Sequence, residues 1–252
     1  PRYAEAARNA ARFILSKLKN KNGRLFHRFR DKELAIHAQA ADYAFLIYGL
    51  ISLYQATFDL EFAEDALSLQ ELMINEFWDD ENGGFFTTGK NDELPVRPKE
   101  LYDGAIPSAN SVAFFNLLCL SRLTGNPNWQ EKAQTLLRAF SGSIKAQPTA
   151  STFFLTGLDF ALRPGQDIVI TGKPEETDVH KLLSTLNLHF TPNKVTLVKS
   201  DQNADRLTRF AEFTDGLEVI RGETTAHLCE NGSCTGSSSD IKSVINQILG
   251  KR

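Results

Sequence analysis

The feature that most constrains the fold is an alternation of two kinds of helix through residues 2–162. Segments of the first kind carry apolar residues along one stripe only, as helices that cover a core do; they span residues 2–19, 61–77 and 128–144. Segments of the second kind are apolar on nearly every side and must be surrounded by protein; they span residues 42–57, 108–123 and 149–162. The alternation predicts three hairpins, each with an amphipathic outer helix and a buried inner helix.

Internal similarity supports the hairpins as repeats. Phe62 and Trp129 differ by 67 positions, and Leu50 and Leu117 share that offset. Repeats of this length bury their apolar faces by stacking on one another, which is the sequence mark of solenoids and related closed arrays. The residues therefore predict an α/α toroid or a helical solenoid.

The pattern changes near residue 164, so we expect a helical domain over residues 1–163 and a small α/β domain over residues 164–252. Residues 167–171 and 194–198 resemble buried strands and flank a predicted helix at 178–188, which favours a short parallel sheet. Other expected elements are strands at 24–29, 85–88 and 216–220, helices at 205–213 and 241–249, a connection at 31–39 and a flexible loop at 236–239.

Composition excludes several function classes. A net charge of −3 gives no electrostatic argument for nucleic acid or for an anionic membrane, and no apolar run reaches the roughly 20 residues of a bilayer span. Three cysteines are too few for a disulfide scaffold and no signal peptide is apparent, so we expect a reducing, cytoplasmic location. The chain begins at Pro1 and its only methionine is Met73, so we expect a processed product or a fragment, and favour a fragment.

A pocket is predicted where a polar loop meets a buried helix. The loop of residues 97–111 contains the turn Tyr102-Asp103-Gly104 and leads into the apolar segment 112–123. Ser108 has the side chain of a helix N-cap. The start of such a helix offers free amides and a partial positive charge, both of which favour polar ligands.

Two carboxylates are the candidate catalytic residues, because Asp42 and Asp103 each precede an inner helix. Paired carboxylates bind sugar hydroxyls or act as acid and base in glycoside hydrolysis. The alternative is that both are helix caps, a role for which aspartate is well suited. The candidate substrate-binding residues in the same connections are Tyr43, Trp78, Tyr102, Ser108 and Asn110.

Neither a metal nor a cofactor is predicted. The five histidines have no metal-ligand spacing, and Gly172-Lys173-Pro174 is a βα turn rather than a nucleotide-binding motif. Cys229 and Cys234 lack the spacing of a redox or zinc motif, so we expect reduced thiols in an exposed turn, with a local disulfide as the alternative. Cys119 should be a buried small hydrophobe.

Four motifs resemble one protein family. They are Asp42–Ile47, Phe77-Trp78-Asp79 with Gly83–Phe86, Asp103-Gly104-Ala105 with Pro107–Val112, and Cys229-Glu230-Asn231 with Cys234. Together they resemble the spermatogenesis-associated, thioredoxin-domain-containing family, whose bacterial members are YyaL-like. One position departs from that pattern, because Ala41 stands where relatives often carry a second acidic residue.

The resemblance implies a mainly α fold: helical hairpins forming part of an (α/α)6 toroid similar to six-hairpin glycosidases and sugar epimerases, followed by a small α/β tail. It implies a carbohydrate ligand, or alternatively a non-catalytic binding or scaffold module that serves a thioredoxin-like domain. Three hairpins would leave an inner helix with an uncovered apolar flank. We therefore expect self-association, or coverage of that flank by the remainder of a longer protein.

Overall fold

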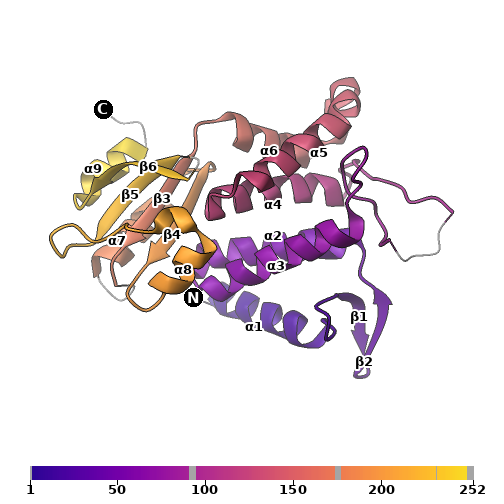
Figure 1. Ribbon diagram of the computed structural model, residues 1–252, viewed down its shortest axis with the longest axis horizontal. Helices are drawn as coiled ribbons and strands as arrows, with labels where there is room; N and C mark the ends of the chain where they lie inside the picture. Colours follow the sequence, from indigo (N-terminus) through magenta and orange to yellow (C-terminus); the bar gives the residue numbers. More distant parts are fainter. Residues whose placement is uncertain (1, 91–94, 174–176, 231, 249–252) are drawn as a thin grey trace. The chain divides into compact units, whose positions relative to one another are not determined.

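The computed structural model describes residues 2–90, 95–173, 177–230 and 232–248. The chain divides into two compact units (Figure 1). The first consists of Pro1–Leu118 and Trp129–Asp159, and the second of Cys119–Asn128 and Phe160–Arg252. Three helices have residues in both units: α4 (Ala109–Thr124), α5 (Pro127–Ala146) and α6 (Thr152–Leu162).

The six predicted helices of the hairpin region are confirmed, with bounds that differ by at most a few residues. They are α1 (Arg2–Lys17), α2 (Ala40–Thr57), α3 (Leu60–Phe77), α4 (Ala109–Thr124), α5 (Pro127–Ala146) and α6 (Thr152–Leu162). A single 3-10 turn, Pro148–Ala150, precedes α6 where the sequence predicted its first residues. Helices α1 and α3 both contact α2.

Burial follows the predicted alternation for α1, α2 and α4, but α6 departs from it, because Thr152, Thr156 and Asp159 are exposed and Leu162 is 75% exposed. Outer helix α1 buries only Ala11 among its residues, whereas Leu50 of inner helix α2 and Phe114 of inner helix α4 are each 1% exposed. Leu118 is buried as well, and Leu46 is partly exposed. Helix pairs around buried helices are therefore present, and the described residues form no closed toroid.

A small hairpin corrects the expected connection at residues 31–39. Strands β1 (Phe26–Arg30) and β2 (Glu33–His37) pair antiparallel. Asp31 and Lys32 form the two-residue turn between them with φ of 52° and 65°, the left-handed conformation that tight hairpin turns require. The strand expected at 85–88 is also wrong, because only an isolated bridge between Trp78 and Phe85 forms there.

The second unit contains a mixed four-stranded sheet in the order β4-β3-β5-β6. Strand β3 (Gln166–Thr171) pairs parallel with β4 (Lys194–Lys199) and antiparallel with β5 (Thr225–Glu230), which in turn pairs antiparallel with β6 (Ser233–Ser238). The parallel βαβ unit is thus confirmed, and the purely parallel sheet is not.

Three helices accompany this sheet: α7 (Thr177–Leu188), α8 (Ala204–Phe210) and α9 (Ile241–Ile248). A 3-10 turn, Glu212–Thr214, follows α8. The strand expected at 216–220 is absent apart from one bridge between Ile220 and Glu223. Most of the loop expected at 236–239 belongs to β6 instead, and Leu249 at the end of the last predicted helix lies outside the described residues.

A buried ion pair anchors the core of the second unit. The Nε atom of Arg122 donates to Oδ1 of Asp167 at 2.8 Å, and its Nη2 donates to the carbonyl of Asn193 at 2.5 Å. Only 10% of the arginine side chain and 4% of the aspartate side chain are exposed. Burial raises the pKa of Asp167, and the hydrogen bond from Arg122 opposes that shift. Arg122 therefore offsets part of the cost of burying this carboxylate within the sheet. Among the described residues, none of the helices combines the length and apolar character that crossing a bilayer requires.

We expect Arg122→Leu to destabilise the second unit by about 3–5 kcal/mol, because it leaves the Asp167 charge buried without a partner. The double variant Arg122→Leu/Asp167→Leu should recover most of that loss. Hydrogen exchange of the β3 amides measures both effects. Equal losses in the single and double variants would contradict a coupled pair.

Candidate functional site

The three inner helices begin at the same end of the first unit. The Ala40 amide at the start of α2 donates to the carbonyl of Thr87 at 3.1 Å. Two residues earlier in that segment, the Phe85 amide donates to Oδ1 of Asn110 in the first turn of α4 at 2.7 Å. One short segment thus ties the starts of α2 and α4 together, and Asp103 ties α4 to α6. The two candidate carboxylates, Asp42 and Asp103, therefore lie at one end of the helical layer.

Asp103 uses both carboxylate oxygens on backbone amides. Its Oδ1 accepts from the Ser108 amide at 2.8 Å, immediately before α4. Its Oδ2 accepts from the amides of Phe153 and Phe154, in the first turn of α6, at 2.8 and 3.2 Å. The amides of a helix's first turn have no partner within the helix, so one carboxylate caps α6 and fixes the start of α4. Asp103 therefore has the geometry of a structural residue that links the starts of two helices.

Asp42 combines a cap with a histidine partner. Its Oδ2 accepts from the Gln39 amide at 2.8 Å, which completes the capping arrangement at the start of α2. Its two oxygens also lie 2.9 and 3.0 Å from Nδ1 of His27 on strand β1. The Asp42 side chain is 30% exposed and that of His27 is 56% exposed. Solvent therefore reaches this histidine–carboxylate pair.

Asn110 and Ser108 are buried and hold the central loop in place. The Asn110 amide nitrogen donates to the carbonyls of Phe85 and Glu100 at 3.0 and 2.8 Å. The Ser108 hydroxyl accepts from the Ser111 amide at 3.2 Å, which is the N-cap bond that the sequence predicted. The polar atoms of Asn110 are occupied by backbone groups, and the Ser108 hydroxyl also donates to the Ser111 hydroxyl at 2.9 Å.

The three aromatic candidates have different surroundings. Tyr43 is buried, its hydroxyl accepts from the Leu25 amide at 2.9 Å, and burial raises its pKa. Trp78 is buried edge-on against Phe85. Tyr102 is 64% exposed at the tip of the central loop. Of the three, only Tyr102 presents its ring to solvent.

A charged pair fixes the loop of residues 79–84. Lys99 forms an ion pair with Oδ2 of Asp79 and donates to the Gly83 carbonyl at 2.6 Å. Asp79 Oδ1 also accepts from the amides of Glu81 and Asn82. The hydrogen bond from Lys99, followed by those from the loop amides, lowers the pKa of Asp79 to about 2. Gly83 has a φ of 72°, and an added Cβ would lie 2.9 Å from Thr135, so this turn requires glycine.

The sequence analysis missed an aromatic cluster on the inner helices. Tyr48 of α2, Phe115 of α4 and Phe153 of α6 have ring centroids 5.8 to 6.0 Å apart. All three are partly exposed and lie in the N-terminal halves of their helices. The tilted and edge-on geometry is favourable for aromatic contacts. Periodicity predicted each of these helices as buried on nearly every side, so it gave no sign that these three rings are partly exposed.

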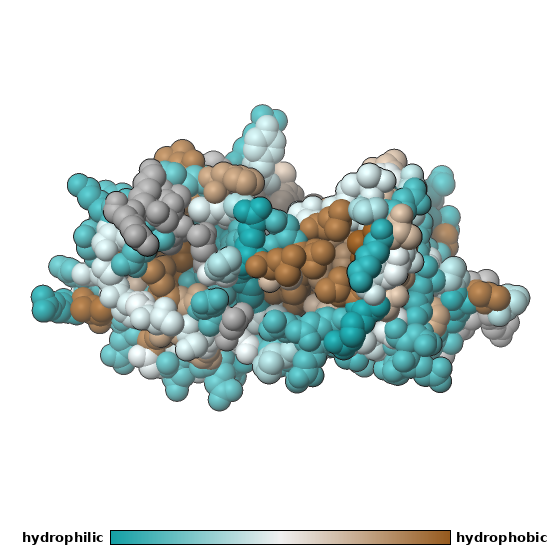
Figure 2. Space-filling model, turned by 90° about the horizontal axis from the view of Figure 1, so that it is seen from above, coloured by the Kyte–Doolittle hydropathy of each residue, from teal (hydrophilic) through white to brown (hydrophobic). Residues whose placement is uncertain are grey.

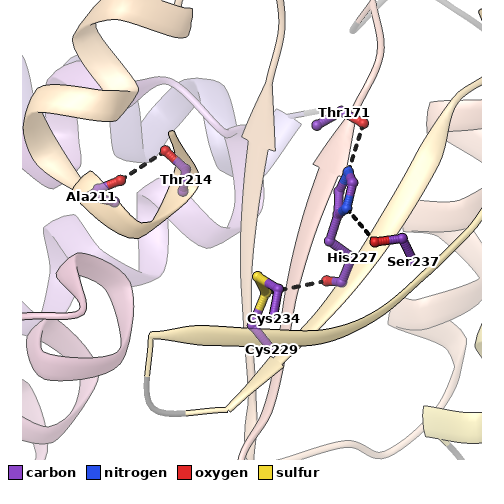
Figure 3. The surroundings of a disulfide bond; sticks show 7 residues. All are labelled: Thr171, Ala211, Thr214, His227, Cys229, Cys234 and Ser237. Atoms are coloured by element: carbon purple, nitrogen blue, oxygen red, sulfur yellow. Dashed lines mark hydrogen bonds between the residues drawn. A yellow bond between two sulfur atoms is a disulfide. The ribbon is translucent and has the colours of Figure 1, made fainter. Parts of the chain in front are cut away.

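The second unit also corrects the expected state of two cysteines. Cys229 and Cys234 form a disulfide across the β5–β6 hairpin (Figure 3), and Cys229 is buried. The prediction of reduced thiols in an exposed turn is therefore wrong for this structure, because the antiparallel register places the two residues opposite each other. Cys119 is buried, as expected.

A buried histidine lies next to the disulfide. His227 contacts the Thr171 hydroxyl through Nε2 at 3.1 Å and the Ser237 hydroxyl through Nδ1 at 2.8 Å (Figure 3). Burial lowers its pKa, so the ring is neutral at pH 7. Within the described part of the chain, no group of three or more His, Cys, Asp or Glu side chains is placed to hold a metal ion.

Comparison with known proteins identifies relatives of this chain. Spermatogenesis-associated protein 20 of rat is 35% identical over 201 residues, which cover 79% of this chain. The human protein of the same name matches equally well. The chain is homologous to a region of spermatogenesis-associated protein 20. An uncharacterised Caenorhabditis elegans protein, B0495.5, is 30% identical over 212 residues. No family model matches the chain.

The match to spermatogenesis-associated protein 20 covers only part of the length of the relatives. The aligned residues span 26% of the rat protein and 29% of the nematode protein, so this chain covers about a quarter of the length of its relatives. The homology confirms the resemblance that the motifs indicated. It does not establish a toroid or a reaction.

The Asp79–Lys99 pair predicts a pH dependence of stability. Because the Asp79 pKa falls from 3.8 to about 2 on folding, its contribution is fully present above about pH 4 and is lost as the pH falls towards 2. We expect Asp79→Asn to lower the free energy of unfolding at pH 7 by about 2 kcal/mol and to flatten its slope between about pH 4 and 2.

Urea unfolding followed by tryptophan fluorescence measures this dependence, since Trp78 and Trp129 both lie in the first unit. Asp80→Asn is the matched control, because the neighbouring Asp80 side chain is 77% exposed. An Asp79→Asn protein with the same pH slope as the Asp80→Asn control would refute the pair's role.

Proposed function

We propose that the first unit binds a carbohydrate through the aromatic cluster of Tyr48, Phe115 and Phe153, and that Asp103 positions helices instead of reacting with the ligand. The observation that carries this proposal is the cluster itself. Three separate inner helices each contribute one partly exposed ring to the same place. Aromatic rings on the inner helices of a packed unit are more often buried.

The partly exposed side of α2 is further support for a binding surface at this place. Phe45, Tyr48, Gly49 and Ser52 recur at helical spacing and are all at least partly exposed, while Ile47, Leu50 and Ile51 are buried. An apolar area is also open to view on the face of the molecule in Figure 2. Apolar surface with aromatic rings and few polar groups is typical of ligand sites.

A sugar suits this chemistry better than a wholly apolar ligand does. Sugar rings have apolar faces that lie flat on aromatic rings and hydroxyls that need polar partners. Among the described residues, the Tyr48 hydroxyl has no hydrogen-bond partner and is thus able to bind a ligand hydroxyl. The cluster lies in the N-terminal halves of the helices, towards the end where Asp42, Ser108 and Tyr102 also lie.

Titration of the 252-residue protein with a panel of mono- and oligosaccharides tests this proposal. In amide NMR spectra we expect chemical-shift changes confined to α2, α4 and α6. Phe115→Ala and Tyr48→Phe should each weaken binding by about ten-fold, because each removes a stacking face or a hydroxyl contact. Phe13→Ala is the control, since Phe13 is half-exposed and pairs with Phe29 away from the cluster.

Absence of shifts with every sugar at millimolar concentration would contradict carbohydrate binding. The alternative of a non-catalytic scaffold would then be favoured, with the cluster covered by other parts of a longer polypeptide or by a second copy of this chain. Sedimentation of the same sample distinguishes these two. The predicted self-association stays a prediction until that measurement.

A second candidate function rests on the His27–Asp42 pair. A carboxylate that orients a solvent-exposed imidazole is the arrangement of a general base. A sugar bound near this end of the helices would then be a substrate for hydrolysis or epimerisation. For this second function, we expect the protein to form a product from the bound sugar. His27→Gln should abolish product formation and leave sugar binding intact. Loss of product in His27→Gln, together with unchanged activity in the control His37→Gln at an exposed histidine of β2, would assign the chemistry to this pair.

A further inference from the structure

The second unit contains a cavity that the sequence analysis did not predict. Its volume is about 460 Å³, within the range of small-molecule sites. It opens at the carboxyl ends of the two parallel strands. Thr171, Gly172 and Lys173 line it after β3, and Lys199, Ser200 and Asp201 line it at the end of β4. In sheets with parallel strands, ligands bind outside the carboxyl ends of those strands.

The backbone at Gly172 approaches its neighbours closely. An added Cβ would lie 2.9 Å from the hydroxyl oxygen of Thr224 and 3.2 Å from Val179. The Gly172 amide donates to the carbonyl of Lys199 at 3.0 Å, which fastens the ends of the two strands together. The wall of the cavity at this point is therefore bare backbone, with no side chain that fills it.

Two lysines supply positive charge. Lys173 is exposed and forms no ion pair with a described residue. Lys199 donates to the carbonyl of Thr214 at 2.8 Å, which leaves two of its three ammonium protons for a ligand. Lysine binds phosphate as a point charge. These two side chains therefore favour an anion in the part of the cavity near the ends of β3 and β4.

Two carboxylates complete the charge pattern. Asp201 follows β4, Glu218 lines the cavity from a later segment, and both are exposed. A bare anion would be repelled by them, whereas ligand hydroxyls would donate hydrogen bonds to them. In dinucleotide-binding folds, an acidic residue after the second parallel strand accepts from a ribose hydroxyl while the first βα turn holds the phosphate. The order of the lysine at 173 and the carboxylate at 201 follows that plan.

We propose that this cavity binds a ribose phosphate, either free or as part of a nucleotide. Lys173 and Lys199 contact the phosphate, and Asp201 accepts from the ribose hydroxyls. The site is separate from the carbohydrate surface on the inner helices and does not depend on it.

Calorimetric titration of the whole 252-residue protein tests the proposal with four probes: ribose 5-phosphate, adenosine 5′-monophosphate, ribose and inorganic phosphate. We expect the two phosphorylated ribose compounds to bind with dissociation constants below about 1 mM. Ribose and inorganic phosphate should each bind at least about ten-fold more weakly, because each lacks half of the contacts. Tighter binding of the nucleotide than of ribose 5-phosphate would identify a nucleotide as the natural form.

Variants locate the site. Lys173→Ala and Asp201→Ala should each weaken ribose 5-phosphate binding by about ten-fold. Lys181→Ala is the matched control and should leave affinity unchanged, because Lys181 is an exposed lysine of α7 paired with Asp178. Ala204→Phe should abolish binding by filling the cavity, and its thermal unfolding checks that the protein is folded. The proposal is overturned if no probe binds, if inorganic phosphate binds as tightly as ribose 5-phosphate, or if the control loses as much affinity as Lys173→Ala.

Discussion

The carboxylate of Asp103 is the contact on which the helical unit depends. It accepts three backbone hydrogen bonds, one from the residue before α4 and two from the first turn of α6. Each of those amides is without a partner in its own helix, and a charged acceptor is stabilised by the positive end of the helix dipole. One side chain thus sets the starting points of two inner helices, and its contact with Phe153 joins residues 50 positions apart in the sequence.

That placement has a consequence for function. Once α2, α4 and α6 start at one end, Tyr48, Phe115 and Phe153 meet as a partly exposed cluster. Asp103, a candidate catalytic residue by its position, uses its carboxylate to hold the starts of two of these helices. The His27–Asp42 pair differs from Asp103. Asp42 caps a helix, but it also contacts His27, whose side chain is exposed to solvent. Homology to spermatogenesis-associated protein 20 extends over 79% of the chain.

Much of the fold was predictable because apolar periodicity is a local signal. Helices α2 and α4 are apolar on most sides and could be predicted within two residues at each end. Strand β2 could not be predicted in this way, because the turn that precedes it places Asp31 and Lys32 at positive φ and contains no glycine. Strand β6 is rich in serine and has weak strand propensity, so only its pairing with β5 forms it. The aromatic cluster and the cavity after β3 and β4 are formed by residues distant in sequence. A pattern within one segment cannot predict that such residues come together.

Asp103 holds the starts of α4 and α6 together through its carboxylate. Hydrogen exchange of the Phe153 and Phe154 amides tests this role most directly, because first-turn amides exchange rapidly unless something outside the helix holds them. The structure predicts that both amides exchange as slowly as the interior amides of α6. It also predicts that Asp103→Ala makes them exchange at the rate of free helix-start amides, while Tyr102→Phe changes nothing. Rapid exchange of both amides in the unmodified protein would show that the carboxylate is free, and would return Asp103 to the list of candidate catalytic groups.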